Sequence, residues 1–244
     1  MDRFTFFSPL PRSEPGGSTF TSAYLTQVQI KANHRVLDLR CASGDRATWV
    51  ARSRGCHIVA VDEEPRYLPV LQGRTADGGA GHLVHPIAAS YGALPFSDES
   101  FRLVMAEGAA LGLGLQKALT EWRRLVPKNG IVAVTYPGVV NKDAPPEVRE
   151  PLERHMVEPL RTLADYHTVV RNSGFELVHQ VPLQPELWDA FYADAMRRAW
   201  ALVAAKAVDK NNQTVREVLA EAHWYRRIGR GRVFLQALVL RRVR

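Results

Sequence analysis

The chain has 244 residues, 46% of them hydrophobic and 23% charged, and these globular proportions exclude extensive disorder. The length is enough for one α/β domain with a continuous core, and no run approaches the roughly 18 apolar residues that a membrane span needs. The net charge of +7 attracts anions, but the arginines near the C-terminus lack interleaved aromatic residues, so a nucleic-acid partner is not expected.

Short apolar runs rich in β-branched residues recur along the chain and have the composition of buried β-strands. They alternate with longer amphipathic stretches, which is typical of an α/β fold with a parallel sheet covered by helices. The predicted strands are residues 35–40, 57–62, 82–87, 101–106, 130–136, 175–183 and 232–242.

Helical spacing is found at residues 45–52, 65–71 and 115–125, between the predicted strands. Apolar residues from 187 to 199 also recur every three or four positions, so this helix should bury one broad stripe. We interpret the stripe as core packing, with substrate contact as the alternative. Residues 141–160 are rich in proline and follow the fifth strand at the edge where such sheets bind ligands, so they are a predicted lid.

The turn after the first strand, DLRCASGD at residues 38–45, lies where open parallel sheets bind ligands. Its small residues let a ligand approach the backbone, and the amides at the N-terminus of the next helix point toward that ligand. Asp62 ends the second strand, where a carboxylate can accept hydrogen bonds from both hydroxyls of a ribose. The turn and Asp62 together predict a nucleoside site in which Asp62 serves mainly the ligand; a plain turn with a helix-capping Asp62 is the alternative.

Five segments in order carry a family pattern: VLDLRCASG (36–44), VDEEPRYL (61–68), ASYGALPFSDESFRLV (89–104), EWRRLVPKNGIVAVTYP (121–137) and NSGFELV (172–178). This pattern resembles the class I S-adenosylmethionine-dependent methyltransferases, near the small-molecule branch that includes quinone methyltransferases. The resemblance implies a Rossmann-like, doubly wound, seven-stranded sheet, mostly parallel with an antiparallel last strand and with helices on both faces.

The resemblance also implies a single domain, residues 1–244, in which three segments have different roles. Residues 1–34, which include a PGGxxxT-like lead-in, would cover the cofactor; residues 35–140 would bind it; residues 141–244 would supply the lid and the substrate side. The cofactor would be S-adenosylmethionine, with S-adenosylhomocysteine as product and a small molecule as methyl acceptor. The expected cofactor contacts are Thr21, Asp38, Arg40, Cys41, Ala42, Gly44, Asp62, Glu63, Ser90, Tyr91 and Glu107.

Three positions depart from the family pattern. Arg40 and Ala42 replace glycines, and Ser90 replaces an aspartate that meets the adenine amino group. Ser90 can still form a hydrogen bond, so the loss is about 0.5 to 1.5 kcal/mol, whereas Ala42 costs roughly 1 to 2 kcal/mol if its φ is positive. Strand alternation places Asp38 and Arg40 on one face, so they can pair, or Arg40 can turn toward the methionine end of the cofactor.

Methyl transfer needs alignment of the reacting groups and exclusion of water more than it needs a dedicated catalytic motif. Glu107 and Tyr136 end the fourth and fifth strands and are candidates to orient the substrate, with packing as the alternative. Our first hypothesis is therefore methyl transfer to a small molecule. A methyltransferase-like binding or assembly protein that has lost transfer is the second, and an RNA methyltransferase is the third.

The remaining features of the sequence concern cellular location, the cysteines, oligomeric state and two histidines. The N-terminus lacks a basic region followed by an apolar stretch, so a cytoplasmic protein is expected. Cys41 and Cys56 are too few for a disulfide scaffold or a thiolate zinc site, and no metal is indicated. We expect a monomer or a homodimer. His155 and His223 are interpreted as incidental, because a lone histidine is seldom catalytic.

Overall fold

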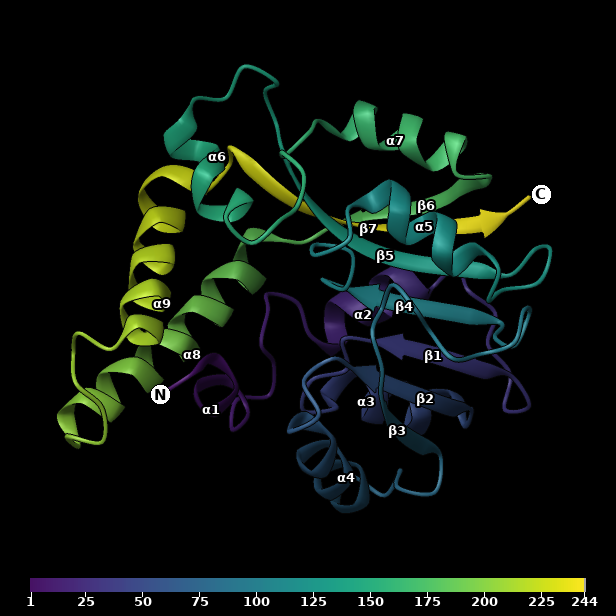
Figure 1. Ribbon diagram of the computed structural model, residues 1–244, viewed down its shortest axis with the longest axis horizontal. Coiled ribbons are helices and arrows are strands. Elements are labelled where there is room, and N and C mark those ends of the chain that lie inside the picture. The colour runs from purple at the N-terminus through teal and green to yellow at the C-terminus, as the bar shows by residue number, and fades with distance from the viewer. Residues whose placement is uncertain (244) are drawn as a thin grey trace.

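The computed structural model describes residues 1–243, and they form a seven-stranded sheet with helices on both faces (Figure 1). The strand order is β3-β2-β1-β4-β5-β7-β6, with β1 to β5 parallel and β7 antiparallel to both of its neighbours. The bounds are β1 Arg35–Leu39, β2 His57–Asp62, β3 Val84–Ala88, β4 Leu103–Glu107, β5 Ile131–Val139, β6 Phe175–Pro182 and β7 Val233–Arg242. The predicted fold class is confirmed.

Alternate residues of the central strands feed two hydrophobic clusters on opposite faces of the sheet. Val36 and Ile58 belong to one cluster, and their neighbours Leu37 and Val59 belong to the other. The first cluster is covered by α2 Ser18–Leu25, α3 Asp45–Arg54 and α4 Tyr67–Asp77, and the second by α5 Leu115–Arg123 and α7 Leu163–Asn172. Both faces are therefore buried, as apolar parallel strands require.

The remaining helices gather beyond the end of the sheet toward which the arrowhead of β1 points in Figure 1. We call this group the cap; it consists of α1 Arg3–Phe7, α6 Pro146–Glu153, α8 Pro185–Ala204, α9 Gln213–Trp224 and the π-helical turn Tyr225–Gly229. Aromatic side chains connect its elements. The rings of Trp188 and Tyr225 stack with their centroids 4.9 Å apart, and the Trp224 indole N–H donates a hydrogen bond to the carbonyl of Glu147. The cap thus lies at the ligand-binding edge.

The predicted element boundaries differ from the observed ones mainly by one to several residues. The first strand ends at Leu39, because Arg40 has a φ of 60° and leaves the extended conformation. Within residues 1–34 the sequence predicts no helix, yet α1 and α2 form there. None of the described helices is both long and apolar enough to cross a membrane.

Candidate functional site

The turn between β1 and α3 lies beside β4, at the point where the strand order reverses. Arg40, Ala42 and Gly44 all have positive φ, at 60°, 45° and 86°. Glycine adopts this conformation freely, whereas each of the other two residues pays roughly 1 to 2 kcal/mol. The turn therefore keeps a backbone suited to glycines and carries strain at two positions.

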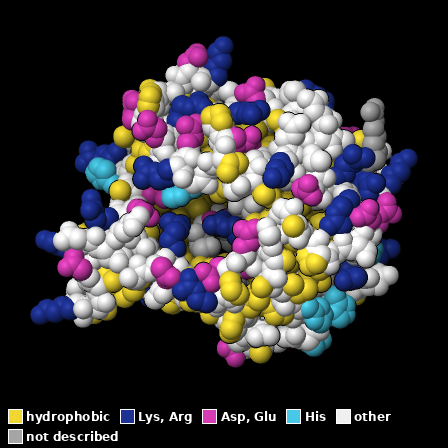
Figure 2. Space-filling view, viewed as in Figure 1, with side chains coloured by type: hydrophobic (Ala, Val, Ile, Leu, Met, Phe, Trp, Pro, Cys, Tyr) yellow, Lys and Arg dark blue, Asp and Glu magenta, His cyan; other side chains and the backbone are white. Residues whose placement is uncertain are grey.

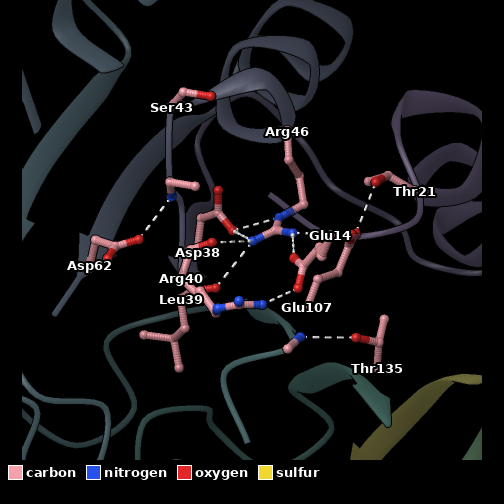
Figure 3. Close-up of polar contacts among 12 residues, drawn as sticks. Glu14, Thr21, Asp38, Leu39, Arg40, Ser43, Arg46, Asp62, Glu107 and Thr135 are labelled. Carbon is pink, nitrogen blue, oxygen red and sulfur yellow. Dashed lines mark hydrogen bonds and ion pairs between the residues drawn. The ribbon is translucent and has the colours of Figure 1, made fainter. Parts of the chain in front are cut away.

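Arg46, on the first turn of α3, is the centre of a buried ionic network (Figure 3). Its Nε donates to Asp38 Oδ1 at 2.7 Å, and its Nη1 lies 3.1 Å from Glu107 Oε2. The same guanidinium donates to the carbonyls of Leu39 and Arg40 and so ties the strand end to the helix. Asp38 is fully buried, and its Oδ2 has no hydrogen-bond partner among the described residues.

The predicted pairing of Asp38 with Arg40 does not form. Arg40 makes an ion pair with Glu14 of the N-terminal segment instead, because its positive φ breaks the alternation that would place it beside Asp38. The Arg40 guanidinium also lies over Gly108, where a Cβ would collide with it. The Arg40–Glu14 pair thus extends across the gap between the ends of β1 and β4.

Burial changes the acidity of this network. Desolvation raises the pKa of Glu14 to about 7, although the guanidiniums of Arg40 and Arg46 favour its charged form. Desolvation likewise raises the pKa of Asp38 to about 6 against the opposing effect of Arg46. Both carboxyls therefore hold protons more tightly than they would in water.

Both predicted substrate-orienting residues are buried and hydrogen-bonded within the protein. Glu107 is 4% exposed and accepts hydrogen bonds from Thr21 Oγ1 at 2.9 Å and from Tyr24 OH at 2.6 Å. Tyr136 is fully buried and donates to Glu158 Oε1 at 2.7 Å. Glu107 thus links β4 to α2, and Tyr136 links β5 to the segment 141–160 that the sequence predicts as a lid.

The ends of β2 and β3 bring a second polar group together. Asp62 Oδ2 accepts from the Ala42 amide at 2.8 Å, and its Oδ1 accepts from the Glu64 amide at 3.0 Å. Glu63 Oε1 accepts from Ser90 Oγ and from the Tyr91 amide, both at 2.9 Å. Asp62 therefore supports two loops while its carboxylate stays at the ligand edge.

The N-terminal segment lies over the turn. The carbonyl of Leu10 accepts from Ser43 Oγ at 3.3 Å and from Arg74, and Arg12 closes the segment on itself through the carbonyl of Gly16. Cys41 lies beneath this segment, and burial raises the pKa of its thiol well above the ordinary value, which disfavours the thiolate form.

A cavity of about 420 Å³ runs from the turn to the cap. Arg40, Glu63 and Tyr91 line its sheet end, and Trp188 and Phe191 of α8 line its cap end. Figure 2 shows the hollow between the two parts of the molecule, with charged side chains along its rim. The predicted stripe on α8 is thus both core and cavity wall. A smaller cavity of about 40 Å³ adjoins the turn and is lined by Thr21, Cys41, Ala42 and Glu107, among others.

Sequence analysis missed three residues of these cavities, Glu14, Arg46 and Glu221, and interpreted a fourth, His155, as incidental. Arg46 directly follows the turn motif, and its position in the first turn of the next helix could have predicted a cation near Asp38. The other residues meet partners far along the chain, which no local pattern reveals. The part of the chain that the structure describes contains no group of three or more His, Cys, Asp or Glu side chains that suits a metal ion.

Comparison with known proteins agrees with this geometry. Residues 36–130 match the family model described as "Methyltransferase domain". An uncharacterized protein of Haemophilus influenzae is 31% identical over 124 residues, covering 50% of this chain and 49% of that protein. The uncharacterized methyltransferase YodH of Bacillus subtilis is 26% identical over 175 residues, covering 71% of this chain and 73% of that protein. The chain thus spans about half the length of the first of these relatives.

The structural comparison extends over nearly the whole chain. A SAM-dependent methyltransferase from Thiobacillus denitrificans, solved in complex with S-adenosyl-L-homocysteine, superposes with a TM-score of 0.84 at 18% identity and covers 98% of both chains. The sequence match identifies residues 36–130 as a methyltransferase domain, and the structural comparison shows that the chain as a whole shares the fold of this SAM-dependent methyltransferase.

Proposed function

We propose that the protein transfers a methyl group from S-adenosylmethionine to a small-molecule acceptor bound in the large cavity. The observation that carries this proposal is the continuity of the cavity, which joins the family's cofactor turn to an aromatic pocket under the cap. One end lies at the switch point of the sheet, where such folds bind nucleotides, and the other end is apolar and partly closed.

The residues at the sheet end fit the cofactor. Asp62 keeps lone pairs for ribose hydroxyls, and Ser90 and Glu63 offer hydrogen-bonding groups beside it. The orphaned Asp38 Oδ2 is a buried acceptor that a ligand ammonium group would satisfy, and Arg40 supplies a cation for a carboxylate. When bound there, the cofactor supplies an electrophilic methyl group. The chain's own residues hold it and exclude water.

Calorimetry with S-adenosylmethionine and with S-adenosylhomocysteine tests the cofactor. We expect saturable binding of both ligands, with S-adenosylhomocysteine at least as tight because it lacks the sulfonium charge near Arg40. Mass spectrometry of small-molecule acceptors incubated with the labelled methyl donor then tests transfer. Failure of both ligands to bind at millimolar concentration would refute the proposal.

A second candidate function is binding without transfer. The strained φ values of Arg40 and Ala42, together with the Arg40–Glu14 pair across the cofactor edge, favour this candidate. Tight binding of both cofactor forms with no turnover of any acceptor would support it.

A further inference from the structure

The cap half of the large cavity has flat aromatic walls. Phe7 of α1 and Phe191 of α8 lie parallel, with centroids 6.2 Å apart and an interplanar angle of 7°. Trp188 and Met156 add further apolar surface to the same cavity. Such walls favour a ligand with a flat apolar body, because parallel and edge-on ring contacts add to the gain from burying apolar area.

One polar cluster interrupts these walls. Glu221 of α9 accepts a hydrogen bond from Tyr192 OH at 2.8 Å, and its Oε2 lies 3.8 Å from His155 Nε2. Arg3 of α1 lines the cavity beside them. These side chains come from four separate segments of the cap and meet in a cavity that also reaches the cofactor edge.

The imidazole of His155 is suited to accept a proton. Burial lowers the pKa of His155, and the nearby Arg3 and Arg154 lower it further, while Glu221 and Glu217 act in the opposite direction. The lowered pKa favours the neutral ring, which has a free lone pair to accept a proton. Once protonated, it becomes the cationic partner of Glu221, which stabilises the charge it has gained.

The charge of this half of the cavity argues against a cationic acceptor. Aromatic walls with one carboxylate would suit an ammonium ion, but the guanidinium of Arg3 lies over the Phe7 ring and brings a positive charge to the same cavity, where it also acts on His155. A neutral acceptor that becomes an anion during the reaction fits better. Arg3 would stabilise the developing negative charge, and His155 would take up the released proton.

We propose that the cap half binds an acceptor with a flat aromatic body and a weakly acidic hydroxyl, a phenol, and that His155 receives its hydroxyl proton. This proposal rests on the proposed function. The phenol oxygen uses a lone pair to form the new C–O bond to the methyl carbon. The C–S bond to that carbon breaks with its electron pair staying on sulfur, so the sulfonium becomes a neutral thioether. The proton passes from oxygen to the imidazole and then to water.

Binding without cofactor tests the acceptor class. Calorimetry at pH 8 compares 2-naphthol with its methyl ether, which has the same ring system but no hydroxyl hydrogen. We expect the wild-type protein to prefer 2-naphthol by about 2- to 12-fold, the range of one hydrogen bond. His155→Leu should remove this preference, and His223→Leu, a matched change on the exposed part of α9, should retain it. The preference should also fall as the pH drops and His155 becomes protonated.

The outcomes separate the acceptor class from the cofactor proposal. Equal binding of 2-naphthol and its ether in the wild type, or a preference that survives His155→Leu, overturns the assignment. Tighter binding of phenyltrimethylammonium than of 2-naphthol overturns it in favour of an amine. S-adenosylhomocysteine binding, measured on the same variants, should be unchanged in His155→Leu. Loss of cofactor binding in the wild type would instead refute the proposed function and leave the acceptor pocket standing.

Discussion

Replacement of Arg40 by glycine tests whether this side chain holds the cofactor or blocks it. The ion pair of Arg40 with Glu14 places a cation and an anion side by side at the cofactor edge. The amino-acid end of S-adenosylhomocysteine carries the complementary pair of charges. We therefore expect the ligand to replace the internal ion pair, with its carboxylate on Arg40 and its ammonium group between Glu14 and the orphaned Asp38 Oδ2.

The expected size of the effect follows from this exchange. Loss of a charge-assisted hydrogen bond costs about 1.5 to 3 kcal/mol, so Arg40→Gly should weaken S-adenosylhomocysteine binding by roughly 10- to 150-fold. Without ligand, glycine relieves about 1 to 2 kcal/mol of strain at a φ of 60°. Glu14 loses its nearest partner but keeps Arg46 at 3.7 Å. We therefore expect the free energy of unfolding to change by about 2 kcal/mol or less.

The assay is calorimetry with two ligands that differ only at the amino-acid end. 5′-Methylthioadenosine keeps the nucleoside and the thioether but lacks the carboxylate and the ammonium group. Arg40→Gly should weaken S-adenosylhomocysteine and leave 5′-methylthioadenosine nearly unchanged. Tighter binding of S-adenosylhomocysteine in the variant would mean that Arg40 obstructs the site. Equal affinities in variant and wild type would place Arg40 outside the site and refute this reasoning.

Three further predictions concern the same edge. Ala42→Gly should raise the free energy of unfolding by about 0.5 to 1 kcal/mol in denaturant titrations, because φ is 45° there, whereas Ala47→Gly within α3 should lower it by about 1 kcal/mol. Asp62→Asn should lower the stability of the free protein by about 1 to 3 kcal/mol, because the Asp62 carboxylate accepts hydrogen bonds from two backbone amides. It should also lower the stabilisation that a bound ligand adds. Unchanged stability in thermal melts would contradict this prediction. The pKa values of Glu14 and Asp38 are raised in the folded protein, to about 7 and about 6, so the folded protein binds more protons than the unfolded one. The free energy of unfolding should therefore fall as pH rises from about 4 to 7. Glu14→Gln should make this dependence on pH weaker in thermal melts from pH 4.5 to 8.

Much of the fold follows from local pattern. The run at 57–62 has the same bounds as β2, because a parallel strand in a sheet covered on both faces is continuously apolar. The run at 175–183 matches β6 to within one residue, although β6 is a partly exposed antiparallel edge strand. The turn at 38–45 could also be identified, because its small residues directly follow a buried strand and Asp62 ends the next strand. The short helix α1 lacks any such signal, because it forms only where Phe6 and Phe7 pack into the cap.

The ion-pair partners in the site could not be predicted from such local strand patterns. Strand alternation predicts an Asp38–Arg40 pair, but it assumes that Arg40 is extended, and the turn begins one residue earlier. The actual partners are Arg46, eight residues after Asp38, and Glu14, which precedes Arg40 by 26 residues. Ion pairs of this kind depend on how the N-terminal segment closes over the sheet, and a single sequence carries no periodic trace of that contact.

The N-terminal segment and the altered turn depend on each other. A glycine at position 40 would leave Glu14 without its nearest cation, and an N-terminal segment without Glu14 would leave the partly buried Arg40 without its ion-pair partner over Gly108. The strain at Arg40 therefore persists because the segment fixes the side chain on the far side of the gap. Under the proposed function, in which Asp62, Glu63 and Ser90 contact the nucleoside end of the cofactor, this arrangement would place the control of cofactor entry at the amino-acid end. Opening the Arg40–Glu14 pair and binding the cofactor then become one step, and the affinity measured for the cofactor includes the free energy of that opening.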